Sequence, residues 1–382
     1  MTPFSENIFQ EEFYTSPMGI IALDGATELA AKIDKYLVAW ANKKSDGVKR
    51  ETFIIDSAYP RFTTGDGKAI INETVRGKDL YIIADVGNHG CTYNMYGKEH
   101  CMSPDEHFAD LKRVISAAGG KPSRITVIMP ILYGGRQHRR NSRESLDCAM
   151  MLQELESMGV RDIITFDAHD PRVQNSVPLM GFDNFFPTYQ ILKAMHKRFP
   201  DVQLDKDHLM VVSPDEGAMA RNIYYASVLG LDLGMFYKRR DYANIVNGRN
   251  PIVAHEYIGS SVMGMDIFVA DDIIATGDSV LKLARELKEK GANNIFFAAT
   301  FALFTEGVDK FQKAYEDGLF TAVLSTNLTY RIPELKKCEW FVEADLSKYI
   351  AYIISACNSN QSVSSLLEPH SKINELLGRI KK

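Results

Sequence analysis

The segment DDIIATGDS, residues 271–279, combines residue types that suit the binding of a phosphorylated sugar. It follows the apolar run DIFVA at 266–270, which is typical of a buried strand. Apolar residues then recur at helical spacing after it, at Val280, Leu283, Ala284 and Leu287. We therefore expect a phosphate-binding turn between a strand and a helix.

The chemistry of this turn would come from its backbone and its polar side chains. Main-chain N–H groups in 275–279, beside a helix N-terminus, bind a phosphate without a basic side chain. The hydroxyls of Thr276 and Ser279 add donors, and Asp271 and Asp272 could accept from sugar hydroxyls or hold Mg²⁺ through water. The alternative is an Asp-rich turn in which Ser279 only caps a helix.

Four further polar clusters follow apolar runs. In YGGRQHRRNSRES, 133–145, an Arg fork suits phosphate oxygens and a Gln amide suits a base or ribose edge, although a solvated basic face is the alternative. FDAHDPRVQNSVP, 166–178, offers a histidine that could equally be a hydrogen-bonded loop residue. VVSPDEGAMAR, 211–221, and FYKRRDY, 236–242, could be site loops or an acidic and a basic turn.

These clusters could form one site only if the fold brings the ends of several strands together. Predicted strands and helices alternate along the chain, which is the pattern of such a fold. Apolar runs predict buried parallel strands at 124–131, 162–166, 208–213, 233–237, 266–270 and 294–299. Helical segments between them end at glycines, a common stop signal, at Gly159, Gly230 and Gly291. The pattern predicts a doubly wound α/β fold, in which ligands bind beyond the carboxyl ends of the strands.

The 382 residues suffice for two such domains, and we place the boundary within GFDNFFPTY at 181–189. This gives an N-terminal domain over 1–184 and a C-terminal domain over 185–382, with the last helix free to pack on the first domain. An N-terminal extension precedes the alternating strands and helices, and 86–107 is interpreted as a long surface insertion.

Composition narrows the class of protein. The net charge of -5 argues against a sequence-independent nucleic-acid binder. Five cysteines without a CxxC pair make a disulfide framework or structural zinc site a poor explanation. The sequence shows no secretory signal and no apolar run long enough to span a membrane, so we expect a cytoplasmic protein.

The motifs taken together resemble a known family. DDIIATGDS is similar to the phosphoribosyl diphosphate motif of type I phosphoribosyltransferases and of ribose-phosphate diphosphokinases. The other clusters resemble the Arg-Gln, Asp-Leu-His-Ala, Ser-Pro-Asp-x-Gly and Lys-x-Arg segments of the diphosphokinases, in the same order. The similarity runs from about residue 50 to the end, and the chain is identified as a divergent member of that family.

The resemblance implies two type I phosphoribosyltransferase-like domains, each a mainly parallel sheet flanked by helices. It implies an enzyme that transfers the diphosphate of Mg-ATP to the 1-hydroxyl of ribose 5-phosphate, with Mg²⁺ as cofactor and a homo-oligomer built from dimers, a hexamer being the larger option. The implied catalytic residues are Lys238 and Arg240, and the implied metal ligands are His169 and Asp215. ATP would be bound by Arg136, Gln137, Phe62 and Asp66. Ribose 5-phosphate would be bound by Asp271, Asp272, Ala275, Thr276, Gly277, Asp278 and Ser279.

The adenine segment departs from the family pattern. The family reads Phe-Ser-Asp-Gly-Glu where this chain reads PRFTTGDGK, with Lys68 in place of the glutamate. Two alternatives therefore stay open beside the diphosphokinase: a phosphoribosyltransferase that consumes phosphoribosyl diphosphate, and a catalytically silent homologue that regulates an active partner.

Overall fold

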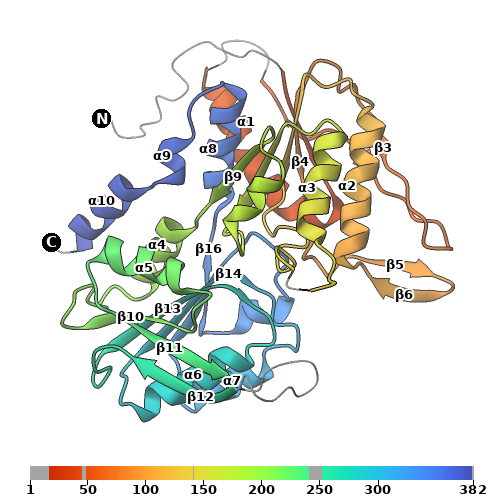
Figure 1. Ribbon diagram of the computed structural model, residues 1–382. Coiled ribbons are helices and arrows are strands. Elements are labelled where there is room, and N and C mark those ends of the chain that lie inside the picture. Colours follow the sequence, from red (N-terminus) through yellow and green to blue (C-terminus); the bar gives the residue numbers. More distant parts are fainter. Residues whose placement is uncertain (1–16, 45–48, 141, 241–251, 381–382) are drawn as a thin grey trace. The chain divides into compact units, whose positions relative to one another are not determined.

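A computed structural model describes residues 17–44, 49–140, 142–240 and 252–380 (Figure 1). The chain divides into two compact units. The first unit comprises residues 1–187, 327–330 and 345–369, and the second comprises 188–326, 331–344 and 370–382. Two segments from the C-terminal half thus belong to the first unit.

The first unit is built on a five-stranded parallel sheet in the order β1-β4-β7-β8-β9. Its strands are β1 (Met18–Ala22), β4 (Asp79–Ile83), β7 (Arg124–Ile128), β8 (Asp162–Phe166) and β9 (Gly181–Phe185). Two small antiparallel pairs accompany it: β2 (Ser57–Ala58) with β3 (Ile70–Ile71), and β5 (Thr92–Met95) with β6 (Lys98–Cys101). Its helices are α1 (Thr27–Lys44), α2 (Pro104–Ala118), α3 (Asp147–Ser157), α8 (Ser347–Asn358) and α9 (Ser364–Leu367), with short 3₁₀ turns at Asp24–Ala26 and Pro171–Ser176.

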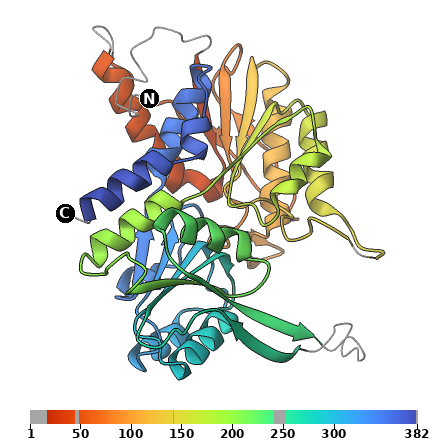
Figure 2. The same ribbon diagram turned by 60° about the vertical axis from the view of Figure 1, so that its left-hand side comes forward.

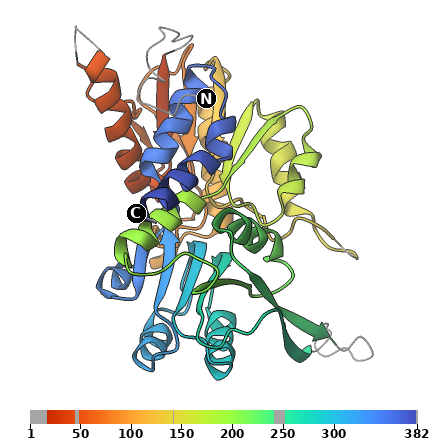
Figure 3. The same cartoon turned by 90° about the vertical axis from the view of Figure 1, so that its left-hand side faces the viewer.

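Helices cover both faces of this sheet. Leu80 and Ile82 of β4 pack into one core cluster with residues of α2 and α3, as their alternation along the strand requires. Helix α8 lies against α1, as Figure 3 shows. The C-terminal end of α8 is fixed by the buried Asp79, which accepts hydrogen bonds from Asn358 at 2.9 Å and from Arg124.

The second unit contains a seven-stranded sheet in the order β12-β11-β10-β13-β14-β15-β16. All its pairs are parallel except β11 with β12, which extend from the edge of the sheet (Figure 2). Its strands are β10 (Leu209–Ser213), β11 (Leu233–Arg240), β12 (Ile252–Ile258), β13 (Asp266–Ile274), β14 (Ile295–Ala302), β15 (Ala322–Thr326) and β16 (Phe341–Ala344). Its helices are α4 (Thr188–Arg198), α5 (Met219–Leu229), α6 (Asp278–Glu289), α7 (Asp309–Glu316) and α10 (His370–Ile380), with a 3₁₀ turn at Pro333–Lys337.

The predicted strands and helix stops are confirmed, but several bounds differ: β7 ends at Ile128, before the predicted 131, and β11 and β14 continue to Arg240 and Ala302. Strand β13 continues past Ala270 to Ile274, because it stays paired with β14 as far as Ala302. The predicted surface insertion at 86–107 lies only partly on the surface. From Pro104 its residues form the first turn of α2, where Ser103 and Glu106 make a capping box, and His107 is buried.

Candidate active site

The loop between β13 and α6 has the form that the sequence predicts. Helix α6 begins at Asp278, and Gly277 before it is left-handed, with φ 85°. The first N–H groups of a helix lack acceptors within the helix, which suits them to bind an anion. In this structure the Asp278 N–H donates to the Thr276 hydroxyl at 3.4 Å, a long hydrogen bond that a bound anion would replace. A backbone hydrogen bond of 3.0 Å from Thr305 to the carbonyl of Ala275 holds the other side of the loop.

Two features of the structure require a glycine at position 277. Its backbone conformation is one that L side chains rarely adopt, and a Cβ atom there would lie 2.2 Å from a ring carbon of the buried Phe311. The close approach of the loop to Phe311 therefore depends on the absence of a side chain.

The loop borders a cavity of about 310 Å³ in the second unit. The cavity is lined by the predicted sugar-phosphate residues Ala275, Thr276, Gly277 and Ser279, together with Asp271 and Asp215. Predicted residues from β13, from the loop that follows it and from the turn after β10 thus surround one space, which has the size of a small-molecule site.

The two carboxylates of the motif are neighbours on β13, and the Asp272 N–H donates to the Asp271 carboxylate at 2.8 Å. Asp271 lines the cavity with Ile273, whereas Asp272 is 8% exposed. Burial and the neighbouring carboxylate of Asp272 raise the pKa of Asp271 above its ordinary value. Arg221, whose Nη1 lies 3.7 Å from Asp271 Oδ1, offsets part of this effect.

Asp215 follows β10 and shapes a turn that also lines the cavity. The hydroxyl of Ser213 donates to the Asp215 carbonyl at 2.7 Å, and the N–H of Ala218 donates to its carboxylate at 3.2 Å. The turn thus fixes Asp215 just before α5, where its side chain lines the cavity.

Asn222 was not predicted, yet it joins the strands that carry both cavity carboxylates. Its side-chain amide is fully buried, donates to the Ala270 carbonyl at 2.8 Å and accepts from the Ala270 N–H at 3.0 Å. Ala270 immediately precedes Asp271 in the sequence. The amide of Asn222 also donates to the Ser213 hydroxyl at 3.4 Å. One side chain thus links β13, through Ala270, to β10, through Ser213.

Asp278 and Thr276 interact with each other in this structure. The Thr276 hydroxyl donates to the Asp278 carboxylate at 3.0 Å, and Lys310 donates to the same carboxylate at 2.7 Å. The hydrogen bond from Lys310 lowers the pKa of Asp278, whose side chain is 72% exposed. The negative charge of Asp278 is therefore paired at the surface, which limits its repulsion of an anion in the loop.

In the first unit, Arg136 and Gln137 lie in the loop after β7. Arg136 is exposed, and the Gln137 side-chain amide donates to the Ser145 carbonyl at 2.9 Å, which closes the loop on itself. His138 follows them, and its ring centroid lies 5.2 Å from that of His169. The structure thus brings the Arg-Gln segment beside the predicted metal ligand His169.

His138 is a second residue that sequence reasoning missed. Its Nε2 lies 3.6 Å from Asp170, and its Nδ1 is buried without a hydrogen-bond partner among the described residues. Hydrogen bonds from Arg172 lower the pKa of Asp170 to about 2, so this carboxylate is ionised. An unsatisfied buried nitrogen beside His169 is the kind of feature that a bound ligand would satisfy.

Phe62 and Asp66 share a tight loop before β3. The Phe62 N–H donates to the Asp66 carbonyl at 2.7 Å, and the Thr64 hydroxyl donates to the Asp66 carboxylate at 2.8 Å. The Phe62 side chain is 54% exposed. An exposed aromatic ring on a closed loop remains available for stacking.

Lys238 and Arg240, the predicted catalytic residues, have their backbone in β11, opposite His255 and Ile252 of β12. Their side chains lie outside the described part of the structure. The predicted metal ligands His169 and Asp215 belong to different units. Among the described residues, no group of three or more His, Cys, Asp or Glu side chains is arranged so that it could hold a metal ion by itself.

Comparisons with known proteins identify the family. A family model described as the N-terminal domain of ribose phosphate pyrophosphokinase matches residues 18–159, and a phosphoribosyl transferase domain model matches 190–323. The ribose-phosphate pyrophosphokinase of Vibrio vulnificus is 29% identical over 317 residues, covering 81% of this chain and 90% of its own length. The chain belongs to the ribose-phosphate pyrophosphokinase family.

Another relative and a solved structure agree with this assignment. The ribose-phosphate pyrophosphokinase of Shewanella oneidensis is also 29% identical over 317 residues, with the same coverage of 81% and 90%. The crystal structure of phosphoribosylpyrophosphate synthetase from Mycobacterium smegmatis has a TM-score of 0.71 and 20% identity, covering 90% of this chain and 99% of that one. The predicted fold class, two α/β domains of the phosphoribosyltransferase type with helices flanking mainly parallel sheets, is confirmed. In the part of the chain that the structure describes, no helix is both long and apolar enough to cross a membrane.

Proposed function

We propose that this member of the ribose-phosphate pyrophosphokinase family transfers the β,γ-diphosphate of Mg-ATP to ribose 5-phosphate. The 1-hydroxyl oxygen forms a bond to the β-phosphorus, the bond between that phosphorus and the α-phosphate oxygen breaks, and the hydroxyl proton is released. The products are phosphoribosyl diphosphate and AMP. The observation that carries this proposal is the 310 Å³ cavity, which combines an anion-binding loop with the carboxylates of Asp271 and Asp215.

The cavity of the second unit and the predicted residues outside it have separate roles in this reaction. The N–H groups at the start of α6 bind the 5-phosphate, and Asp271 accepts from the ribose hydroxyls. Asp272, predicted for the same role, is buried and is not among the residues that line the cavity. Arg136, Gln137, Phe62 and Asp66 bind ATP. Lys238 and Arg240 stabilise the charge that develops on the transferred group, since orientation and electrostatics supply most of the catalysis in phosphoryl transfer.

The residues present fit a magnesium cofactor. Burial and the adjacent Asp272 raise the pKa of Asp271, so a bound cation would stabilise its ionised form, and carboxylate oxygens are ligands that Mg²⁺ prefers. Asp271 and Asp215, which line one cavity of the second unit, would hold Mg²⁺ there directly or through water. In the first unit, His169 would be a ligand of the Mg²⁺ bound to ATP. Bound Mg²⁺ would neutralise charge on the diphosphate group. We propose further that the enzyme is a homo-oligomer, which light scattering on the purified chain would measure.

The test is direct turnover. Purified protein is incubated with Mg²⁺, ATP and ribose 5-phosphate, and ³¹P NMR follows the formation of phosphoribosyl diphosphate and AMP. Absence of both products over a range of phosphate concentrations would refute the proposal and leave the silent homologue. Consumption of phosphoribosyl diphosphate with a free base would instead indicate a phosphoribosyltransferase.

The role of Lys238 has its own test. Lys238→Ala should leave ATP binding largely intact while turnover falls at least ~100-fold, because the cation acts on charge that develops in the transition state. Turnover equal to that of the unaltered enzyme would remove Lys238 from the mechanism.

A further inference from the structure

The hairpin β5–β6 stands out from the rest of the first unit (Figure 1). Its strands pair Thr92 with Cys101 and Met95 with Lys98, and its turn is formed by Tyr96 and Gly97. Both turn residues are left-handed, with φ 49° at Tyr96 and 75° at Gly97. Asparagine would adopt the first of these positions with less strain than tyrosine, so the tyrosine is not explained by the turn itself.

The hairpin tip contacts the loop that carries Phe62 and Asp66. The Tyr96 N–H donates to the Thr63 carbonyl at 2.9 Å. Met95 packs so closely on Gly65 that a Cβ atom on this glycine would lie 2.6 Å from the Met95 sulfur. The tip therefore holds the middle of the loop 62–66 through one backbone hydrogen bond and one packed side chain.

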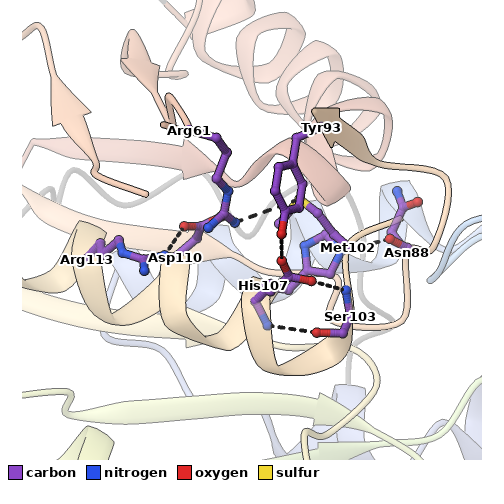
Figure 4. Close-up of polar contacts among 9 residues, drawn as sticks. Arg61, Asn88, Tyr93, Met102, Ser103, His107, Asp110 and Arg113 are labelled. Atoms are coloured by element: carbon purple, nitrogen blue, oxygen red, sulfur yellow. Dashed lines mark hydrogen bonds and ion pairs between the residues drawn. The ribbon is translucent and has the colours of Figure 1, made fainter. Parts of the chain in front are cut away.

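Arg61 anchors the start of the same loop (Figure 4). Its guanidinium lies 2.5 Å from Asp110 of α2 and 5.2 Å from the ring centroid of Tyr93 in β5. The Arg61 side chain is 9% exposed and that of Asp110 is 5% exposed. Because a buried ion pair is costly to break, Arg61 fixes the loop to both α2 and the hairpin.

Tyr93 in turn is fixed to α2. Its hydroxyl donates to the carboxylate of Glu106, which also accepts from the Ser103 N–H at 2.7 Å in the capping box of α2 (Figure 4). The hairpin is thus attached to the helix at its base and to the loop at its tip. Between these attachments the loop displays Phe62 with 54% of its side chain exposed, and Tyr96 is 77% exposed.

We propose that the hairpin β5–β6 is a positioning element that holds the loop 62–66 in its ligand-binding conformation, and that the ligand is the purine base of a nucleoside triphosphate. This inference rests on the proposed function. A loop held in its bound conformation before the ligand arrives binds more tightly, because less freedom is lost on binding. The hairpin therefore affects the nucleotide and leaves the ribose 5-phosphate cavity of the second unit unchanged.

The main experiment shortens the hairpin. Residues 93–100 are replaced by Gly-Gly, which can join Thr92 to Cys101 because these two residues pair in register. We expect KM for ATP to rise about 10-fold or more and preference for ATP over CTP to shrink, with KM for ribose 5-phosphate within about 2-fold of the unaltered value. Lys98→Ala, an exposed change on the same hairpin, is the matched control and should change neither constant.

A milder variant guards against loss of folding. Tyr93→Leu removes the ring from Arg61 and the hydroxyl from Glu106, whereas Tyr93→Phe removes only the hydroxyl, so their effects on KM for ATP should be graded. Calorimetric titration with ATP separates the two proposals, since it needs no turnover. An unaltered enzyme without product refutes the proposed function. Unchanged ATP affinity and ATP–CTP preference in both the shortened hairpin and Tyr93→Leu refute the role of the hairpin.

Discussion

The carboxylate of Asp85 accepts a hydrogen bond of 2.9 Å from the hydroxyl of Thr329, 244 residues further along the chain. The same carboxylate accepts from the Tyr330 N–H at 2.9 Å, and from the N–H of Gly87 at 2.9 Å in its own loop. Asp85 is 3% exposed, and the ring of Tyr330 meets His89 edge-on. One buried carboxylate thus fixes residues 327–330 to the loop after β4.

We predict that Asp85→Ala destabilises the protein by ~2–4 kcal/mol, because it leaves several buried donors without an acceptor. Urea denaturation measures the loss. Asp201→Ala, an exposed position, is the control and should cost less than ~0.5 kcal/mol. Equal stability of the two variants would show that the Thr329 attachment contributes nothing.

Gly277→Ala is expected to destabilise the second unit by ~2–5 kcal/mol and to abolish binding of ribose 5-phosphate. The left-handed backbone alone costs ~1–2 kcal/mol with a side chain, and displacement of Phe311 adds ~1–3 kcal/mol. Gly318→Ala separates these contributions, because Gly318 is also left-handed, with φ 72°, but a Cβ atom there would meet nothing within 4 Å. Denaturation and calorimetric titration should rank the two variants in that order, and the reverse order would contradict the argument.

Asn222→Ala should raise KM for ribose 5-phosphate about 10-fold or more while KM for ATP changes little. The variant frees the N–H and the carbonyl of Ala270, so Asp271 loses its fixed position on β13. Steady-state kinetics with each substrate varied in turn measures the split. Equal increases in both constants would indicate general loss of structure and no positioning role.

Stability should decrease below about pH 6.5 because of His107. Burial lowers the pKa of His107, whose Nε2 lies 2.7 Å from the Asn88 carbonyl and must donate to it. The folded state therefore binds this proton less readily than the unfolded state. The contribution of His107 to the free energy of unfolding is therefore complete above the ordinary histidine pKa of about 6.5. It is lost as the pH falls toward the lower pKa that His107 has in the folded state.

The measurement is a series of urea denaturations between pH 5 and pH 8. The contribution of one histidine to the slope is at most ~1.4 kcal/mol per pH unit. His107→Gln keeps a donor and cannot titrate, so its profile should be flatter by that contribution. Identical slopes for the two proteins would exclude His107 as a source of acid sensitivity.

The sequence predicts the strands well because buried parallel strands are continuous apolar runs. It fails at the end of β13, where Asp271 and Asp272 interrupt the run although Ile273 and Ile274 remain paired with β14. Carboxylates at a functional edge break the local pattern that marks a strand. The roles assigned to the cavity residues remain predictions, although the structure does gather Asp215 with the loop 275–279.

The residues that sequence reasoning missed act across long separations. Asn222 is an ordinary helix residue until β13 places Ala270 against it, 48 positions away. The importance of His138 is seen only when the fold places it beside His169. That of Arg61 is seen only from its contacts with Asp110 and Tyr93. A single sequence carries no signal for such pairs, because each residue type is common at its own position.

The return of α8 to the first unit has a consequence for biosynthesis. Trp40 of α1 stacks on Tyr352 of α8 with ring centroids 4.6 Å apart, and Asp79 of β4 accepts a hydrogen bond from Asn358. Trp40 and Asp79 are synthesised early, whereas their partners are synthesised near the end of translation. During synthesis the surface of α1 therefore stays uncovered until residues 347–358 of α8 have left the ribosome, which happens only when the chain is almost complete. A chain truncated before α8 would lack the contacts of α8 with α1 and would leave the ring of Trp40 without Tyr352.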